Sequence, residues 1–397
     1  MKPMHKALIT SMFTLFISST TLHSEIIATE KDNTTRTADC LKLIDTKILP
    51  FDKTYKDTKV GGLSGITYDP KNDKWLLISD DRSEHNPARF YEADIDYNSN
   101  EFKDVKFNGV HKLKQPNGKD YINKEQYKND DDNIVADPES IRFDPHTNEI
   151  LYTSEGDRSL GLNPFIRKAT EDGKYSTEIP VKDTIKMDKQ NKKGFRNNQA
   201  IEGSTFSQDG NTLWTSMEGP LIQDGQKPTP DSGALSRITQ YDREGNILSE
   251  FAYPLDAVPK KPGKNKQADN GITEILAIND HEFLTLERAS VQAEDGSFSN
   301  YVRIYKIDVS KGTDIKDINS LKETNAKPLN KTLVADLNEQ DIGKVDNIEG
   351  MTFGKKLPNG NDSLVLTADN NFNETQQSQI IAFEVKPEKN NPFLKTD

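Results

Sequence analysis

Acidic residues recur along the 397-residue chain at two fixed places in a series of similar segments. One place is the start of an apolar run, and the other is the end of the apolar run that follows. The residues at the first place are Ser64, Glu139, Glu202, Glu274 and Glu349, so that serine replaces the acid once. Those at the second place are Asp80 or Asp81, Glu155, Glu218, Glu287 and Asp369. Carboxylates that gather raise one another's pKa unless cations balance them, so this pattern is typical of an ion-binding site.

Basic side chains lie close to these acids in the sequence. Arg82 and Arg288 directly follow acidic residues, and Arg158 lies three residues after Glu155. Guanidinium groups bind phosphate in a planar, bidentate manner, so they favour an anionic or phosphorylated small substrate. A ring of salt bridges that only ties the segments together is the alternative interpretation of the same residues.

The elements that position these residues follow from the repeat. Successive residues at the first place lie 75, 63, 72 and 75 positions apart, and a long, loosely fixed period marks a repeat architecture. Each copy adds a third apolar run, and most add a fourth, as in Asp104–Leu113, Ile247–Tyr253 and Lys331–Leu337. Four antiparallel strands per repeat, arranged radially, form a β-propeller blade. The sequence therefore predicts an all-β propeller with five blades, or six if a long insertion hides a degenerate copy.

The last copy lacks a fourth strand, because only a polar tail follows Val385. The run Leu41–Leu49 has strand character and no local partner. We expect it to complete the last blade and close the ring, which leaves no open sheet edge.

This arrangement predicts where the acids meet. In an antiparallel blade the first strand begins at the end where the second strand finishes, so both sets of acids lie on one face. The innermost strands surround the central channel, and the carboxylates are therefore expected to converge at its mouth. Calcium suits such a ring because it takes six to eight oxygen ligands, including amide oxygens. The histidines show no ligand spacing, which disfavours zinc.

Composition and the chain ends set further expectations. A net charge of −12 argues against binding of nucleic acid. Residues 1–24 have a basic start and a short apolar run, which is the layout of a signal peptide rather than a membrane span. We expect an exported, periplasmic or extracellular bacterial protein that is a monomer and has no membrane span. The predicted divisions are a signal peptide 1–24, a disordered leader 25–40, a propeller domain 41–387 and a polar tail 388–397.

Several motifs along the chain resemble the bacterial phytase-like family that is described by its "esterase-like activity of phytase". They are Gly61–Ile66, Ser79–Arg82, Pro87–Tyr91, Asp137–Glu139, Ser154–Gly156, Asn163–Arg167, Arg196–Asn198, Glu202–Gly203, Met217–Pro220 and Asp346–Gly350. The likeness spans residues 58 to 386, with the motifs in order. The resemblance implies a propeller fold, in agreement with the repeat, and an esterase-like or phytase-like hydrolase.

We predict hydrolysis of an ester or phosphoester at the channel mouth, dependent on calcium. The expected catalytic residues are Asp81, Arg82, Glu155, Glu218 and Arg288. The expected substrate-binding residues are Arg158, Arg167, Arg196 and Asn197. The expected calcium ligands are Glu139, Glu202, Glu274, Glu349, Asn198, Asn270 and Asn347. The alternatives are a calcium-dependent lactonase or carboxylesterase, and a binding propeller whose acids hold a structural ion.

Overall fold

The computed structural model describes residues 36–129 and 132–386. The expected signal peptide, residues 25–35 of the expected leader and the expected tail lie outside the described residues. The last residues of the expected leader, 36–40, belong to the fold. Ala38 and Asp39 are buried, and Asp39 forms an ion pair with Lys306 of the fourth blade. The described fold therefore includes a few residues before the predicted strand.

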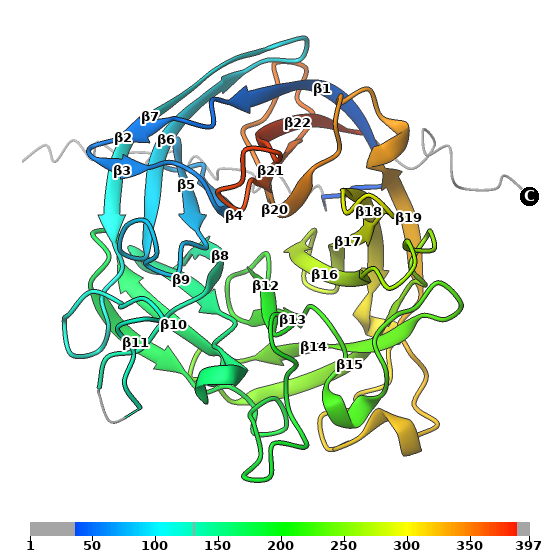
Figure 1. Ribbon diagram of the computed structural model, residues 1–397. Coiled ribbons are helices and arrows are strands. Elements are labelled where there is room, and N and C mark those ends of the chain that lie inside the picture. Colours follow the sequence, from blue (N-terminus) through cyan, green and yellow to red (C-terminus); the bar gives the residue numbers. More distant parts are fainter. Residues whose placement is uncertain (1–35, 130–131, 387–397) are drawn as a thin grey trace, which may run out of the picture. The chain divides into compact units, whose positions relative to one another are not determined.

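The chain forms five four-stranded antiparallel blades around a central axis, as predicted (Figure 1). The first blade contains β4 (Leu63–Asp69), β5 (Lys74–Ser79), β6 (Arg89–Tyr97) and β7 (Phe102–Lys112). The second contains β8 (Pro138–Phe143), β9 (Glu149–Ser154), β10 (Phe165–Thr170) and β11 (Tyr175–Ile179). The third contains β12 (Ile201–Phe206), β13 (Leu213–Met217), β14 (Ala234–Tyr241) and β15 (Ile247–Leu255). The fourth contains β16 (Ala268–Ala277), β17 (Glu282–Gln292), β18 (Phe298–Asp308) and β19 (Lys331–Asp336).

The fifth blade joins the two ends of the described chain. It contains β20 (Asn347–Phe353), β21 (Ser363–Asp369), β22 (Ser378–Lys386) and, as its outermost strand, β1 (Cys40–Leu49). β1 pairs antiparallel with β22, from Leu41 opposite Val385 to Leu49 opposite Ser378. The predicted ring closure is confirmed, and in Figure 1 the blue β1 lies along the red β22.

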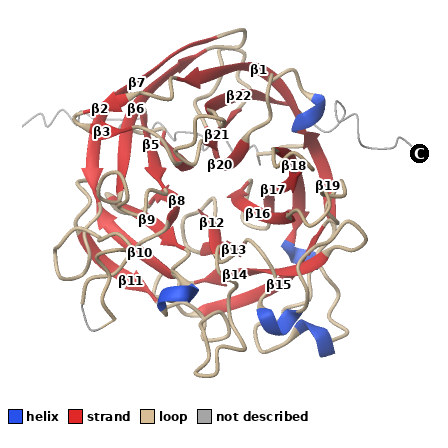
Figure 2. Cartoon of the chain, in the orientation of Figure 1, coloured by secondary structure: helices blue, strands red, loops and turns tan. Residues whose placement is uncertain are grey.

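The remaining elements of the described chain are short. They are a hairpin, β2 (Thr54–Tyr55) with β3 (Thr58–Lys59), and single-turn 3-10 helices that appear as short helical pieces in Figure 2. These helices are η1 (Arg158–Leu160), η2 (Ile222–Asp224), η3 (Val309–Lys311), η4 (Leu321–Glu323) and η5 (Leu337–Glu339). Within the described ranges, no helix is long and apolar enough to cross a membrane.

Apolar side chains form a core between each pair of neighbouring blades. Trp214 of the third blade, for example, packs on Phe283 of the fourth with ring centroids 4.6 Å apart. Leu49 of β1 belongs to the core between the fifth and first blades, whereas Leu41 of the same strand belongs to the core between the fourth and fifth. β1 therefore contributes to two of these cores, which stabilises the closed ring.

The inner strands approach one another too closely for side chains at certain positions. A Cβ atom on Gly203 would lie 2.6 Å from the backbone nitrogen of Ile275, and one on Gly350 would lie 2.7 Å from the carbonyl oxygen of Ser64. Glycine therefore follows the acid in the Glu202–Gly203 and Glu349–Gly350 motifs because backbone of the next blade occupies the side-chain space.

One buried arginine spans the channel below its mouth. Arg142 of β8 donates hydrogen bonds to the carbonyl oxygens of Ile66 (2.6 Å), Ser204 (2.6 Å), Met351 (3.1 Å) and Ile275 (3.4 Å). These four residues lie on the inner strands of the other four blades. Arg142 also forms an ion pair with Glu274 at 2.6 Å. A single side chain thus links all five inner strands and fills the channel between its two ends.

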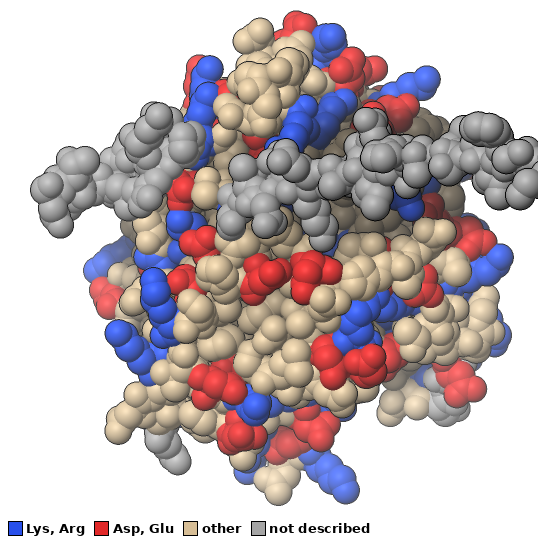
Figure 3. Space-filling model, turned by 180° about the vertical axis from the view of Figure 1, so that it is seen from behind, with Lys and Arg blue, Asp and Glu red and all other residues tan. Residues whose placement is uncertain are grey.

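The face opposite the mouth carries acidic and basic side chains interspersed over its described surface (Figure 3).

Candidate active site at the channel mouth

Each inner strand starts at the mouth with a local irregularity that aims one side chain toward the axis. In the third blade the register shifts between Ile201 and Gly203, so that Glu202 is an extra residue opposite β13. The fifth blade has the same shift around Glu349, and the second blade shifts between Pro138 and Ile141, around Glu139. Such β-bulges re-aim a side chain and are common beside active sites.

In the fourth blade the acidic residue lies one position after the bulge, and not in it. Its bulge lies between Ile272 and Glu274, so Thr273 occupies the place that Glu202 and Glu349 occupy elsewhere. On β17, Glu287 pairs with Ile272, and Arg288 is the next residue. In the third and fifth blades the residue at this position is Glu218 or Asp369, so Arg288 replaces an acid here. A shift of one residue exchanges the two faces of a strand, which moves Glu274 and Glu287 away from the mouth.

The carboxylates at the mouth form two groups that share Glu155. In one group, ligand oxygens of Asp137, Glu139 and Glu155 lie within 4.8 Å of one another. In the other, oxygens of Glu155, Glu202 and Glu218 do the same. All of these side chains are buried except Glu139, which is half-buried. The two groups therefore form one continuous acidic cluster, to which the neighbouring Asp80, Glu349 and Asp369 add further charge.

Burial disfavours the charged form of every carboxyl group in this cluster. Burial raises the pKa of Glu218 to about 8, an effect that the positive charge of Arg288 opposes. Burial and the nearby Glu349 raise the pKa of Asp369 to about 8. Burial likewise raises the pKa of Asp137 to about 7, against the opposing charge of Arg82. Burial, followed by repulsion from Glu218 and Asp137, raises the pKa of Glu155 well above its ordinary value.

Two arginines compensate part of the negative charge. Arg288 contacts Glu218 at 3.1 Å and Glu349 at 3.2 Å. Burial lowers the pKa of Arg288, but the neighbouring Glu349, Glu218 and Glu202 outweigh it and raise that pKa overall. Arg82 forms an ion pair with Asp157 and lies 3.6 Å from Asp137.

The cluster is nevertheless far from neutral when fully ionised. Its acidic members are Asp80, Asp137, Glu139, Glu155, Glu202, Glu218, Glu349 and Asp369. Among these eight carboxylates, Arg288 supplies one full positive charge. Arg82 supplies less, because it also forms an ion pair with Asp157. Protons or bound cations must supply the remaining positive charge.

The structure brings together about half of the predicted site residues. Glu139, Glu155, Glu202, Glu218, Glu349, Arg82 and Arg288 all belong to the cluster or contact it. Asn347 joins them, because its amide donates hydrogen bonds to Glu349 at 2.9 Å and Asp369 at 3.2 Å. Asn198 lies at the edge of the mouth, in a left-handed backbone conformation with φ of 57°.

Asp80, and not the predicted Asp81, faces the cluster. Asp81 instead accepts hydrogen bonds from the backbone nitrogens of Glu84 (2.8 Å) and Asn86 (2.9 Å), and it pairs with the buried Arg89 at 2.7 Å. Asp81 therefore stabilises the loop between β5 and β6, whereas Asp80 adds negative charge at the mouth.

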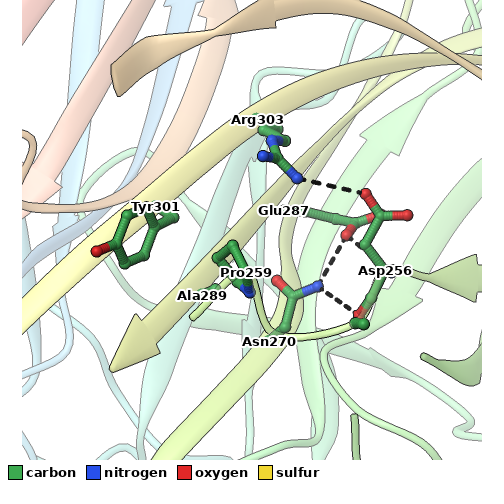
Figure 4. Close-up of a pocket in the computed structure, with 8 residues that line it drawn as sticks. Asp256, Pro259, Asn270, Glu287, Ala289, Tyr301 and Arg303 are labelled. Carbon is green, nitrogen blue, oxygen red and sulfur yellow. Dashed lines mark hydrogen bonds and ion pairs between the residues drawn. The ribbon is translucent and has the colours of Figure 1, made fainter. Parts of the chain in front are cut away.

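Glu274 and Asn270 lie elsewhere because of the one-residue shift. Glu274 pairs with Arg142 inside the channel. Asn270 donates hydrogen bonds to the carboxylate of Glu287 (2.9 Å) and the backbone oxygen of Asp256 (3.0 Å) in a small separate pocket that Arg303 also lines (Figure 4). These contacts engage both side chains away from the mouth.

The predicted substrate-binding residues hold loops in place. Arg158 donates to the carbonyl oxygen of Phe195 (2.6 Å), and its backbone nitrogen donates to the Asn197 side chain (2.8 Å). Arg196 donates to the carbonyl oxygens of Pro220 (3.1 Å) and Gly225 (2.6 Å). Arg167 on β10 pairs with Glu178 at 2.8 Å. Their guanidinium groups are thus engaged outside the cluster.

Sequence reasoning missed Asp137, Thr273 and Arg142. Asp137 stands two residues before Glu139, as Asn347 stands two residues before Glu349, so the repeat itself carried a signal for it. Thr273 and the role of Arg142 carried none, because both depend on the exact bulge position and on contacts across the channel.

A cleft of about 880 Å³ opens from the cluster. Arg288, Asn347 and Glu349 lie at its base. One wall is the β17–β18 hairpin, including Ser290, Phe298 and Asn300, and the other is the loop after β21, including Asn371 and Asn373. The cluster is therefore accessible to a small molecule from one side of the ring.

The fold and this site define a five-bladed propeller with a buried acidic cluster at one mouth. The chain belongs to the Phytase-like family, described as "Esterase-like activity of phytase", whose model matches residues 58–372. The resemblance noted from the motifs is thereby confirmed.

Solved structures give weaker similarities. A thermostable family-43 glycoside hydrolase has a TM-score of 0.40 and 10% identity, with 87% of this chain and 99% of that chain covered. The catalytic domain of a Coprinopsis cinerea GH62 α-L-arabinofuranosidase has a TM-score of 0.39 and 8% identity, covering 88% and 98%. A Xanthomonas campestris gluconolactonase has a TM-score of 0.29 and 10% identity, covering 88% and 98%. None of the curated proteins compared with the chain matches it significantly.

Proposed function

We propose that this propeller is a hydrolase of esters or phosphoesters that works at the channel mouth with a bound divalent cation, calcium being the best fit. The observation that supports it most directly is the excess of buried carboxylates over arginines in the cluster. The Phytase-like family, with its esterase-like activity, agrees with a hydrolase.

The residues present fit a calcium ion. Asp137, Glu139 and Glu155 offer oxygens within 4.8 Å of one another, and Glu202 lies in the adjoining group. The Thr273 hydroxyl is buried and, among the described residues, has no hydrogen-bond partner. Carboxylate and neutral oxygens together are the ligand set that calcium takes. When bound, the cation would supply Lewis-acid polarisation of the substrate oxygen.

The chain's own residues account for the other requirements of hydrolysis. Burial raises the pKa of Glu218 to about 8, so its ionised form is a stronger base than an ordinary glutamate and can accept a proton from water as the pH approaches 8. The Arg288 guanidinium lies 3.1 Å from Glu218, and its Nε has no hydrogen-bond partner within the described chain. Arg288 can therefore donate to the negative charge that develops on an ester oxygen.

A calcium-dependent lactonase or carboxylesterase is the second candidate. The cationic side chains that line the cleft are Arg288 and Lys344, and acids of the protein already pair with both. Such a cleft suits a substrate with little negative charge. A binding propeller with a structural ion is the non-enzymatic alternative on the same residues.

The test compares two glutamates of the cluster. Calcium-loaded protein should hydrolyse p-nitrophenyl acetate or p-nitrophenyl phosphate. Glu218→Gln should lower kcat at least 100-fold while calcium binding persists, since a proton acceptor typically contributes 10²–10⁴-fold. Glu139→Gln should weaken calcium binding and hydrolysis together.

Asp280→Asn provides the control, because Asp280 is an exposed acid at the opposite end of the ring. It should change neither property. Calcium binding without hydrolysis of either ester would reject the enzyme and favour the binding propeller.

We also propose export, which rests on the basic and then apolar residues 1–24. The intact mass of the protein recovered from its native host should lack this segment. A cytoplasmic protein that retains Met1 would contradict export.

A further inference from the structure

The cleft beside the cluster has a chemical character of its own. Amide side chains line it on both walls, including Asn300, Asn371 and Asn373, together with the Ser290 hydroxyl. An amide offers two donors and an acceptor, so such a wall can match groups that both donate and accept hydrogen bonds. Alcohol hydroxyl groups have this property.

One aromatic ring is exposed at this cleft. Among the described residues, the strongly exposed large apolar side chains are Ile48, Leu248 and Phe298. Ile48 and Leu248 lie on the outermost strands β1 and β15, whereas Phe298 is 53% exposed and lines the cleft. An aromatic face left open to a polar pocket provides an apolar platform for a ligand ring.

The two walls are built to hold these groups in position. β17 continues four residues beyond Arg288, to Gln292. Because a strand rises about 3.3 Å per residue, the β17–β18 hairpin extends about 13 Å beyond the cluster. On the other wall, the Asp369 carboxylate accepts a hydrogen bond from the Asn371 backbone nitrogen at 2.7 Å. Asn371 and Phe372 both have positive φ, 46° and 51°, a strained conformation that persists where surrounding contacts impose it.

The charge of the cleft is balanced within the protein. Lys344 pairs with Asp346 at 2.7 Å, and Arg288 pairs with Glu349 at 3.2 Å. A substrate with several phosphate groups would therefore meet two cations already engaged and two carboxylates that repel it. A neutral group meets no such penalty.

We propose that this cleft is a subsite for a neutral, polyhydroxylated ring of the sugar type, whose C–H face packs on Phe298 while its hydroxyl groups bond to the amide-lined walls. The inference rests on the proposed function, since the same molecule would present its ester group to Glu218 and Arg288 at the base of the cleft. It identifies the substrate class as an ester of a carbohydrate with at most one anionic group.

The experiment uses methyl β-D-glucopyranoside as the probe and saturation-transfer NMR on the full chain. Saturation should reach the ring protons of the sugar, and cyclohexanol at the same concentration should show much less. Phe298→Ala should weaken binding of the sugar at least fivefold, and Phe298→Tyr should restore it. Leu248→Ala is the matched control for an exposed apolar residue, and it should leave binding unchanged.

A second arm tests the charge argument. In metal-free protein, inositol hexakisphosphate should not displace the sugar probe at an equal concentration. Absence of sugar-specific saturation, equal binding by Phe298→Ala, or displacement by the polyphosphate would each overturn the subsite.

Hydrolysis of p-nitrophenyl acetate separates this inference from the proposed function, because that ester carries no sugar. Its rate of hydrolysis in the unchanged protein reports on the proposed function alone, whereas binding of the sugar probe reports on the subsite. Hydrolysis without sugar binding would reject the subsite alone, whereas Phe298-dependent sugar binding without hydrolysis would uphold the subsite and reject the enzyme.

Discussion

At the scale of single residues, the mouth depends on which side chain occupies each bulge. Glu139, Glu202 and Glu349 occupy equivalent bulges, and the acidic composition of the repeat predicted them. The fourth blade places Thr273 and Arg288 where the pattern suggested two acids. Periodicity finds the strand but does not fix its register to one residue, and a one-residue shift exchanges its faces.

Arg288 should therefore serve two purposes that a substitution can separate. Arg288→Ala removes the cation that contacts Glu218 and Glu349, so calcium should bind at least as tightly as before. Hydrolysis should fall about 100-fold, because a donor to the developing charge is lost. Calorimetry and steady-state kinetics on the same preparation measure both effects.

Arg196→Ala is the control for Arg288→Ala, because Arg196 donates only to loop carbonyl oxygens in the contacts described above. It should leave hydrolysis unchanged. Weaker calcium binding by Arg288→Ala would contradict the view that arginine and calcium compete for the same carboxylates.

At the scale of elements, the strands and their pairing were predictable because each copy repeats the same alternation of apolar runs. The predicted fourth strand Ile247–Tyr253 falls within β15, and Leu41–Leu49 falls within β1. The arginine that crosses the channel could not be predicted. Its role depends on carbonyl groups from four other strands, which come together only in the closed ring.

Arg142→Met should destabilise the protein by about 3–5 kcal/mol, because it leaves the buried Glu274 without its partner. Urea denaturation measures the change in the free energy of unfolding. The double variant Arg142→Met with Glu274→Gln should recover part of the loss, since it removes the unpaired charge. Additive losses in the double variant would show that the ion pair does not couple the two residues.

At the scale of the whole molecule, the ring concentrates acids at one end of a channel that Arg142 fills from below. Folding therefore buries carboxyl groups whose pKa values rise, to about 8 for both Glu218 and Asp369 because of burial. Groups with raised pKa values hold their protons more tightly in the folded state. Without metal, the stability they contribute is greatest below their unfolded pKa values near 4 and is lost as pH rises toward 8.

The most direct test of the account is the thermal stability of metal-stripped protein with and without calcium at pH 5 and pH 8. Without calcium, Tm should be lower at pH 8 than at pH 5, because the cluster must ionise. Calcium should raise Tm at pH 8 by more than at pH 5, since it binds the ionised carboxylates of the folded state. A Tm that calcium leaves unchanged at pH 8, with no heat in a calorimetric titration, would contradict the cation site and leave a cluster balanced by arginines and protons.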